Sequence, residues 1–198
     1  MDEAYVLPRP ASIEDPLRIA VLISGGGSGL AALLQYQESE ARAHQTVLVL
    51  ADSQDAGGLE HGRSREIETH GISLPQVEDK VQRRQSHEEL VHDALVKADV
   101  ELVVLSGYMR KLTPSIARRW KGRLINIHPS LLPKYPGAHA QRDALAAGAT
   151  VSGCTVHLVD EGVDSGMILA QSEVPVSYTH LRAHETLRYL VCRLLLEK

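Results

Sequence analysis

Short runs of apolar residues alternate with segments in which apolar residues recur at helical spacing along most of the chain. Such short continuous runs, ending at glycine or polar residues, are typical of strands buried on both faces of a parallel sheet. We predict strands at residues 18–24, 46–51, 72–74, 102–106 and 124–128, and helices at residues 30–34, 58–70, 87–98 and 113–120. Because strands and helices alternate, the expected fold class is α/β, with an open, mostly parallel sheet and helices on both faces.

The segments before and after this alternation follow other patterns. Residues 151–159 and 168–176 are strand-like and are separated by a turn rich in glycine and aspartate, which predicts an antiparallel hairpin at the end of the sheet. Residues 1–16 are polar and punctuated by proline, so we expect an irregular lead-in. A chain of 198 residues is long enough for one core and short for two, which predicts a single domain over residues 17–176.

Composition and charge narrow the class of protein. The formal net charge of -4 offers no cationic field for a nucleic-acid backbone, so we expect small-molecule substrates and no nucleic-acid partner. Cys154 and Cys192 lie far apart, and no His, Cys and carboxylate spacing suggests a bound metal. The chain shows neither a secretory signal pattern nor an apolar run near the roughly 20 residues of a membrane helix. We therefore expect a soluble, cytoplasmic monomer or homodimer that does not bind membranes.

A glycine-rich loop lies between the first predicted strand and the first predicted helix. Gly27, Ser28 and Gly29 stand where backbone N–H groups and a helix N-terminus can face an anion. Glycine also occurs at such turns for backbone geometry alone. The loop lacks the lysine of a Walker motif, whereas Asp52, which follows the second strand, leaves a dinucleotide site as a poorer alternative.

Two polar side chains interrupt the last predicted parallel strand. Asn126 and His128 alternate with apolar residues, so both lie on one face of the strand, at the edge where open α/β sheets bind ligands. An unpaired buried polar group costs on the order of 1–3 kcal/mol, so these residues indicate a site, although a structural, hydrogen-bonded histidine is the alternative. Asp164 lies in the acidic turn of the hairpin, and such a turn is by itself usually only solvated. No Gly-x-Ser-x-Gly elbow supports a hydrolase.

Four segments, taken together and in this order along the chain, are specific enough to indicate a protein family. They are residues 21–28 (VLISGGGS), 105–110 (LSGYMR), 126–137 (NIHPSLLPKYPG) and 153–166 (GCTVHLVDEGVDSG). Over about residues 18–176 the chain resembles the phosphoribosylglycinamide formyltransferase family. The resemblance implies the formyltransferase fold and formyl transfer from 10-formyltetrahydrofolate, as co-substrate, to 5'-phosphoribosylglycinamide in purine synthesis, with no metal.

The resemblance also implies the roles of individual residues. The catalytic residues would be Asn126, His128 and Asp164. The nucleotide would bind at Gly27, Ser28, Gly29, Pro129 and Gly137, and the folate at Arg84, Met109, Arg110, Leu112, Val159 and Asp160.

Three positions depart from the family pattern. Gly29 stands where the family commonly has asparagine, and Lys111 stands where an apolar residue usually lines the folate pocket. The arginine that meets the folate tail corresponds to Arg84, or to His87 if a deletion is assumed.

The tail at residues 177–198 departs further, because it replaces the family's acidic linker and long final helix. It looks like a translated library adapter, so we expect a non-native tail. A divergent helix is the alternative, since an apolar stripe recurs at helical spacing. The stripe consists of Leu187, Leu190, Val191, Leu194 and Leu195.

Two rival enzymes would pass the formyl group to a different acceptor, and a third rival has no catalytic function. A formyltetrahydrofolate deformylase would share the Asn, His and Asp chemistry but use water, and its family carries an additional N-terminal regulatory domain. Methionyl-tRNA formyltransferase is disfavoured by residues 134–137 (KYPG) and by the acidic charge balance. A non-catalytic folate- or nucleotide-binding fragment is the rival from another class.

Overall fold

The computed structural model describes residues 5–176, so the predicted tail at residues 177–198 lies outside the described residues. A seven-stranded sheet with the order β3-β2-β1-β4-β5-β6-β7 runs through the molecule. The pairings from β3 to β5 are parallel, whereas β6 pairs antiparallel with both β5 and β7. The strands are β1 (Leu17–Ile23), β2 (His44–Ala51), β3 (Glu68–Gly71), β4 (Leu102–Leu105), β5 (Leu124–His128), β6 (Val151–Leu158) and β7 (Ile168–Pro175). The predicted α/β class and terminal hairpin are confirmed.

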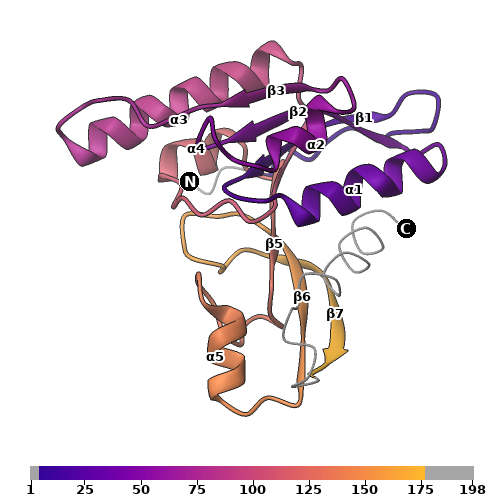
Figure 1. Ribbon diagram of the computed structural model, residues 1–198, viewed down its shortest axis with the longest axis vertical. Coiled ribbons are helices and arrows are strands. Elements are labelled where there is room, and N and C mark those ends of the chain that lie inside the picture. Colours follow the sequence, from indigo (N-terminus) through magenta and orange to yellow (C-terminus); the bar gives the residue numbers. More distant parts are fainter. Residues whose placement is uncertain (1–4, 177–198) are drawn as a thin grey trace.

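Helices cover both faces of the parallel part of the sheet. They are α1 (Ser28–Ser39), α2 (Leu59–Arg63), α3 (Lys80–Lys97), α4 (Pro114–Arg119) and α5 (Ala140–Ala146). In Figure 1, α1 and α3 lie on opposite sides of β1 and β2, and α5 lies beside β6 at the end of the molecule away from α3. One core cluster contains residues of α1 and α2, and the other contains residues of α3 and α4. Alternate residues of β1 enter each cluster, as its burial on both faces requires.

The region between β2 and α3 corrects two predictions. The helix predicted at residues 58–70 ends at Arg63, because Glu66 adopts a positive φ of 57° that breaks the helical path. The strand predicted at residues 72–74 is instead β3, four residues upstream. β3 is an edge strand with half-exposed and exposed polar side chains, so a search for a buried apolar run passes over it.

Two helices differ from the sequence prediction: one is longer than predicted, and the other was not predicted. α3 begins at Lys80 rather than near residue 87, because the Asp79 side chain accepts a hydrogen bond from Gln82 N at 2.7 Å and caps its first turn. The added turns are mostly exposed and polar, so they carry no apolar stripe. α5 was not predicted, and only the small Ala140 and Ala144 are buried on it.

The sheet brings three loops to one edge. β1, β4 and β5 are neighbours and run parallel, so the loops that follow them leave from the same carboxyl edge. These loops contain the glycine-rich segment, residues 106–113 and residues 129–139. The strand order therefore places the predicted nucleotide, folate and catalytic segments around one region.

Adjacent residues of α3 provide a matched test of the core. The Leu95 side chain is 1% exposed and that of Val96 is 55% exposed. We expect Leu95→Ala to lower the free energy of unfolding by about 2–5 kcal/mol through the cavity it leaves. Val96→Ala should change it by less than about 0.5 kcal/mol. Urea denaturation of both variants checks this, and equal losses would contradict the assignment of α3 to the core.

Candidate active site

The two polar residues of β5 face a polar residue of the neighbouring strand. In the antiparallel pairing, Asn126 lies opposite His157 and His128 lies opposite Thr155. Side chains opposite each other project from the same face of the sheet. Ile127 projects the other way into the core. The pattern of β5 thus places Asn126, His128 and His157 on one face.

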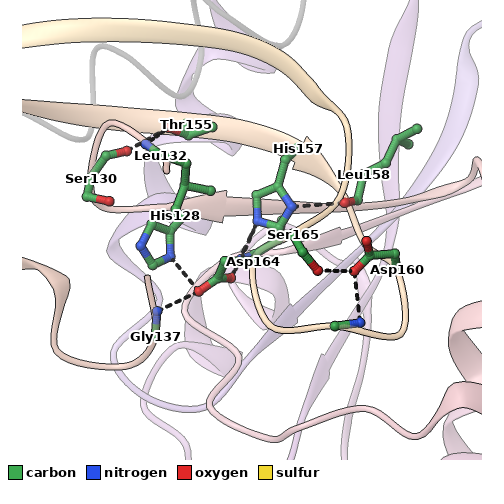
Figure 2. A network of polar contacts seen from close by, with 12 residues as sticks. His128, Ser130, Leu132, Gly137, Thr155, His157, Leu158, Asp160, Asp164 and Ser165 are labelled. Atoms are coloured by element: carbon green, nitrogen blue, oxygen red, sulfur yellow. Dashed lines mark hydrogen bonds and ion pairs between the residues drawn. The ribbon is translucent and has the colours of Figure 1, made fainter. Parts of the chain in front are cut away.

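Asp164 completes this group from the turn between β6 and β7. Its φ of 52° is a left-handed conformation, and the carboxylate lies between the rings of His128 and His157 (Figure 2). Asp164 Oδ2 lies 3.4 Å from His128 Nδ1, and Oδ1 lies 3.5 Å from His157 Nε2. Asn126 Nδ2 donates to Oδ1 at 3.3 Å, and Gly137 N donates to Oδ2 at 2.7 Å. The structure therefore brings together the three predicted catalytic residues and Gly137.

Both ring nitrogens of His128 face hydrogen-bond acceptors. Nε2 lies 2.9 Å from the carbonyl oxygen of Tyr135, which can only accept, so Nε2 carries a hydrogen. Nδ1 faces the Asp164 carboxylate, which also only accepts when ionised. The imidazolium satisfies both acceptors, whereas the neutral ring would turn a lone pair toward the carboxylate. At 3.4 Å the Nδ1 contact is longer than a charge-assisted hydrogen bond, so this donor stays free to turn toward another oxygen.

His157 fixes the orientation of the Asn126 amide. His157 Nδ1 donates to Leu158 O at 2.9 Å, and its Nε2 lies 3.5 Å from Asp164 Oδ1. Asn126 Nδ2 lies 3.1 Å from that nitrogen and 3.3 Å from Asp164. The amide therefore turns its NH2 group toward His157 and Asp164.

These neighbours keep Asp164 charged. Hydrogen bonding with His157 contributes most to lowering the pKa of the Asp164 carboxyl from 3.8 to about 2. The Gly137 N–H and the charges of His128 and His157 lower it further, against burial, which raises it. A carboxylate with this pKa is ionised throughout the neutral range.

Buried hydroxyl groups shape the loop that follows His128. Thr155 Oγ1 donates to Ser130 O at 2.6 Å and accepts from Leu132 N at 3.0 Å (Figure 2). Ser130 Oγ in turn donates to Lys134 O at 2.6 Å. The Thr155 and Ser130 side chains are fully buried. This network places Tyr135 against His128 and Gly137 against Asp164. Pro129 lies at its start, half-buried directly after His128.

The glycine-rich loop is held by α2. Gly27, with φ 65°, caps the N-terminus of α1, and Ser28 and Gly29 begin the helix. Gly58 N donates to Gly25 O at 3.0 Å, and a Cβ at position 58 would lie 2.8 Å from that oxygen. The glycine at position 58 thus permits the close approach that shapes the loop. The N–H groups of the first turn of α1 face the carboxyl edge of the sheet.

The loop after β4 is tied to three elements of the structure. Met109 N donates to Ser24 Oγ at 2.8 Å, and Arg110 Nε lies 2.8 Å from Asp52 Oδ2 at the end of β2. Thr113 N donates to Glu88 Oε1 of α3 at 2.7 Å, and its hydroxyl also bonds that carboxylate. Asp52, the residue on which the dinucleotide alternative depends, is thus engaged by Arg110.

The remaining predicted folate residues lie around this loop. Met109 is exposed, whereas Leu112 and Val159 pack partly against the core cluster of α3 and α4. Asp160 accepts bonds from Gly162 N and Ser165 Oγ and so shapes the turn that contains Asp164. Lys111 is exposed.

The structure separates the two candidates for the folate tail. His87 is fully buried and lies 2.7 Å from Ile72 O through Nε2, so it faces the core. Arg84 is exposed, one helical turn before Glu88, which contacts Thr113. Residues four apart share a helix face, so Arg84 is the candidate on the side of the loop.

Within residues 5–176, no group of three or more His, Cys, Asp or Glu side chains is arranged to hold a metal ion. In the same residues no helix is long and apolar enough to cross a membrane.

Comparison with known proteins identifies the family. The Formyl transferase family model matches residues 17–190. The chain is 39% identical over 161 residues to the phosphoribosylglycinamide formyltransferase of Escherichia coli K12, covering 81% of this chain and 74% of that protein. The chain belongs to the phosphoribosylglycinamide formyltransferase family. The predicted formyltransferase fold is confirmed.

Other members of the family agree in structure and sequence. The crystal structure of phosphoribosylglycinamide formyltransferase from Brucella melitensis has a TM-score of 0.81 at 35% identity, covering 91% of this chain and 94% of that chain. The chain is 47% identical over 161 residues to the trifunctional purine biosynthetic protein adenosine-3 of Drosophila melanogaster. That match covers 80% of this chain but only 12% of the trifunctional protein.

Some residues of the candidate site were not predicted from the sequence. The sequence analysis assigns no role to His157, yet it lies in contact with Asn126 and Asp164. Its signal was present, because β6 is an apolar strand that carries a histidine on the face shared with β5. Glu88 gave no signal, since a single carboxylate on a helix is usually solvated.

The low pKa of Asp164 predicts a pH-dependent contribution to stability. Because its pKa is about 2 in the fold and ordinarily 3.8, the charged group stabilises the fold above about pH 4, and this contribution is lost as the pH falls toward about 2. We expect wild type to be more stable than Asp164→Asn at neutral pH, with the difference shrinking between about pH 4 and about pH 2. Urea denaturation across this range measures it.

Glu161→Gln is the matched control, because Glu161 lies in the same turn and forms only an exposed ion pair with Arg118. It should have little effect at any pH. A difference between wild type and Asp164→Asn that does not change with pH would contradict the stabilised carboxylate.

Proposed function

We propose that the chain transfers the formyl group of 10-formyltetrahydrofolate to the amine of 5'-phosphoribosylglycinamide, a step of purine synthesis. The observation that carries the proposal is the convergence of Asn126, His128 and Asp164 at the sheet edge from which the glycine-rich loop and residues 106–113 also leave. Membership of the family supports both substrates. The cytoplasmic location and the monomeric or dimeric state stay predictions.

The reaction joins the amine nitrogen to the formyl carbon and breaks the bond between that carbon and N10 of the folate. The tetrahedral intermediate carries a negative oxygen, which hydrogen-bond donors stabilise where charge develops. The attacking amine loses one proton and the folate nitrogen gains one, so the products are the formylated ribonucleotide and tetrahydrofolate.

His128 and Asn126 supply the donors for the negative oxygen. The His128 side chain is only 4% exposed, and its Nδ1 hydrogen makes no short hydrogen bond. A substrate oxygen in front of this nitrogen would receive a charged donor from a dry environment, where electrostatic interactions are strong. The Asn126 Nδ2 group, which lies 3.1 Å from His157 Nε2 and 3.3 Å from Asp164 Oδ1, provides the second donor when the substrate oxygen replaces one of these two contacts.

The main role of Asp164 is to keep His128 charged, and it is not the base that accepts the amine proton directly. A carboxylate with a pKa of about 2 binds protons weakly at neutral pH, so it is a poor direct acceptor for the amine proton. We assign it the role of keeping His128 in the charged form and of orienting a water that relays the proton to N10. The Gly137 N–H, which bonds the same carboxylate, keeps it in place.

The two substrates occupy separate loops in this proposal. The ribonucleotide phosphate binds at Gly27, Ser28 and Gly29, with Pro129 and Gly137 on the side of the acceptor amine. The pterin lies against residues 109–112 and the turn that contains Val159 and Asp160, and Arg84 meets the folate tail. The free N–H groups of the first turn of α1 support the phosphate site.

In the deformylase alternative, water accepts the formyl group at the same site. The same donors would serve both reactions, so the acceptor decides between them. Relatives named phosphoribosylglycinamide formyltransferase favour the ribonucleotide.

Replacing His128 tests the catalytic role. We expect His128→Ala to lower kcat for formyl transfer by at least about 1000-fold while folate affinity stays within about tenfold, because the ring acts on charge of the transition state. Steady-state kinetics and fluorescence titration of folate measure these. His70→Ala is the control, since His70 is an exposed histidine of the edge strand β3 that pairs only with Glu68. Parallel losses of affinity and turnover would indicate a structural role for His128.

The Asp52–Arg110 ion pair gives a test of the folate loop. Asp52→Asn removes the charge that holds Arg110, so we expect the KM for the folate to rise about three- to thirtyfold, as loss of a partly buried charged contact implies. The KM for the ribonucleotide should change less than twofold. A larger change for the ribonucleotide than for the folate would contradict the placement of the folate on this loop.

A further inference from the structure

Gly29 of α1 and Ser106 at the end of β4 compete for the same space. A Cβ at position 29 would overlap Ser106 Oγ and lie 3.7 Å from Ser106 Cβ. Ser106 N donates to Leu22 O at 2.9 Å, so the backbone of Ser106 is fixed to β1. The hydroxyl lies beside the first turn of α1, in the volume that a side chain at position 29 would fill.

The Ser106 hydroxyl makes no hydrogen bond to another of residues 5–176, whereas its polar neighbours are engaged. Ser24 Oγ accepts from Met109 N, and Ser24 N donates to Gly107 O at 3.1 Å. In α1, the first bond within the helix is that of Ala31 N to Gly27 O at 2.8 Å, which leaves the N–H groups before it without an intrahelical partner. Ser106 thus adds a free hydroxyl donor beside free amide donors.

The glycine-rich loop contains no lysine or arginine at residues 24–29. A phosphate that binds there is held by N–H and hydroxyl groups, and each such bond to a charged oxygen contributes more than a bond between neutral groups. A hydroxyl that donated a hydrogen bond to this phosphate would therefore have a measurable effect on its affinity.

We propose that the Ser106 hydroxyl binds the phosphate of the ribonucleotide substrate, in the place that a side chain at position 29 would otherwise take. The proposal rests on the proposed function for the identity of the ligand. It accounts for glycine at position 29, because any larger residue would turn the Ser106 hydroxyl away from α1. Ser106 is a specificity residue for the phosphate end of the acceptor and takes no part in the transfer of the formyl group.

A double-mutant cycle on the full chain tests the pair. Ser106→Ala should raise the Kd for 5'-phosphoribosylglycinamide about tenfold, as expected for one hydrogen bond to a charged group. Gly29→Ala should raise it by a similar factor, because the methyl group displaces the hydroxyl. The double variant should be no weaker than Ser106→Ala alone, since both changes remove one interaction. The KM for 10-formyltetrahydrofolate should stay within twofold in all variants.

Two further measurements separate the explanations. The dephosphorylated acceptor, glycinamide riboside, should bind wild type and Ser106→Ala equally, since it lacks the group that the hydroxyl contacts. Ser73→Ala controls for serine replacement, because Ser73 is an exposed serine between β3 and α3, outside the proposed substrate loops. Thermal denaturation shows whether each variant is folded.

Two results would overturn the proposal: an unchanged Kd for the ribonucleotide in Ser106→Ala, or additive losses in the double variant. If wild type transfers the formyl group normally while Ser106→Ala binds like wild type, this inference is wrong and the proposed function stands. If wild type binds the ribonucleotide but does not formylate it, the proposed function fails, and the Kd values still decide the role of Ser106. If wild type does not bind the ribonucleotide, both are wrong.

Discussion

The Asp164 carboxylate is the interaction on which the geometry of the site depends. It accepts from the Asn126 amide and the Gly137 N–H, and it faces the rings of both His128 and His157. These partners come from β5, from β6 and from the loop after β5, so one charged group connects segments that the chain reaches separately. Without the charge, the His128 and Asn126 donors would lose the acceptor that orients them.

The antiparallel pairing of β5 and β6 makes this arrangement possible. It sets His157 directly opposite Asn126, and the turn after β6 then returns Asp164 to the same face. The parallel pairings of β1, β4 and β5 place the two proposed substrate loops next to that face. The sheet therefore supplies the position of every group, while the tight loops after its strands supply the orientation.

The sequence predicted the parts of the fold that are marked by apolar periodicity. Six strands follow from continuous or alternating apolar runs, namely β1, β2, β4, β5 and the two strands of the terminal hairpin, β6 and β7. β3 and the first turns of α3 could not be found in this way, because they are exposed and polar, and a capping aspartate decides where α3 begins. α5 buries only alanines, which carry too little hydrophobic signal to mark a helix face.

Part of the candidate site was also predictable from the apolar pattern, because polar residues interrupt it. Asn126 and His128 stood out because polar residues at buried strand positions need partners. Asp164, Glu88 and the Ser106 side chain did not, because their positions depend on contacts between distant segments that spacing along the chain does not encode. The family resemblance supplied Asp164, and the structure supplied the geometry of its contacts.

The central claim is that this site passes the formyl group to the ribonucleotide and not to water. The most direct measurement follows tetrahydrofolate and formylated ribonucleotide over time, with 10-formyltetrahydrofolate and with 5'-phosphoribosylglycinamide present or omitted. The account predicts equal amounts of the two products when the ribonucleotide is present and no enzymatic release of tetrahydrofolate when it is omitted. Release at the same rate without the ribonucleotide would contradict the account.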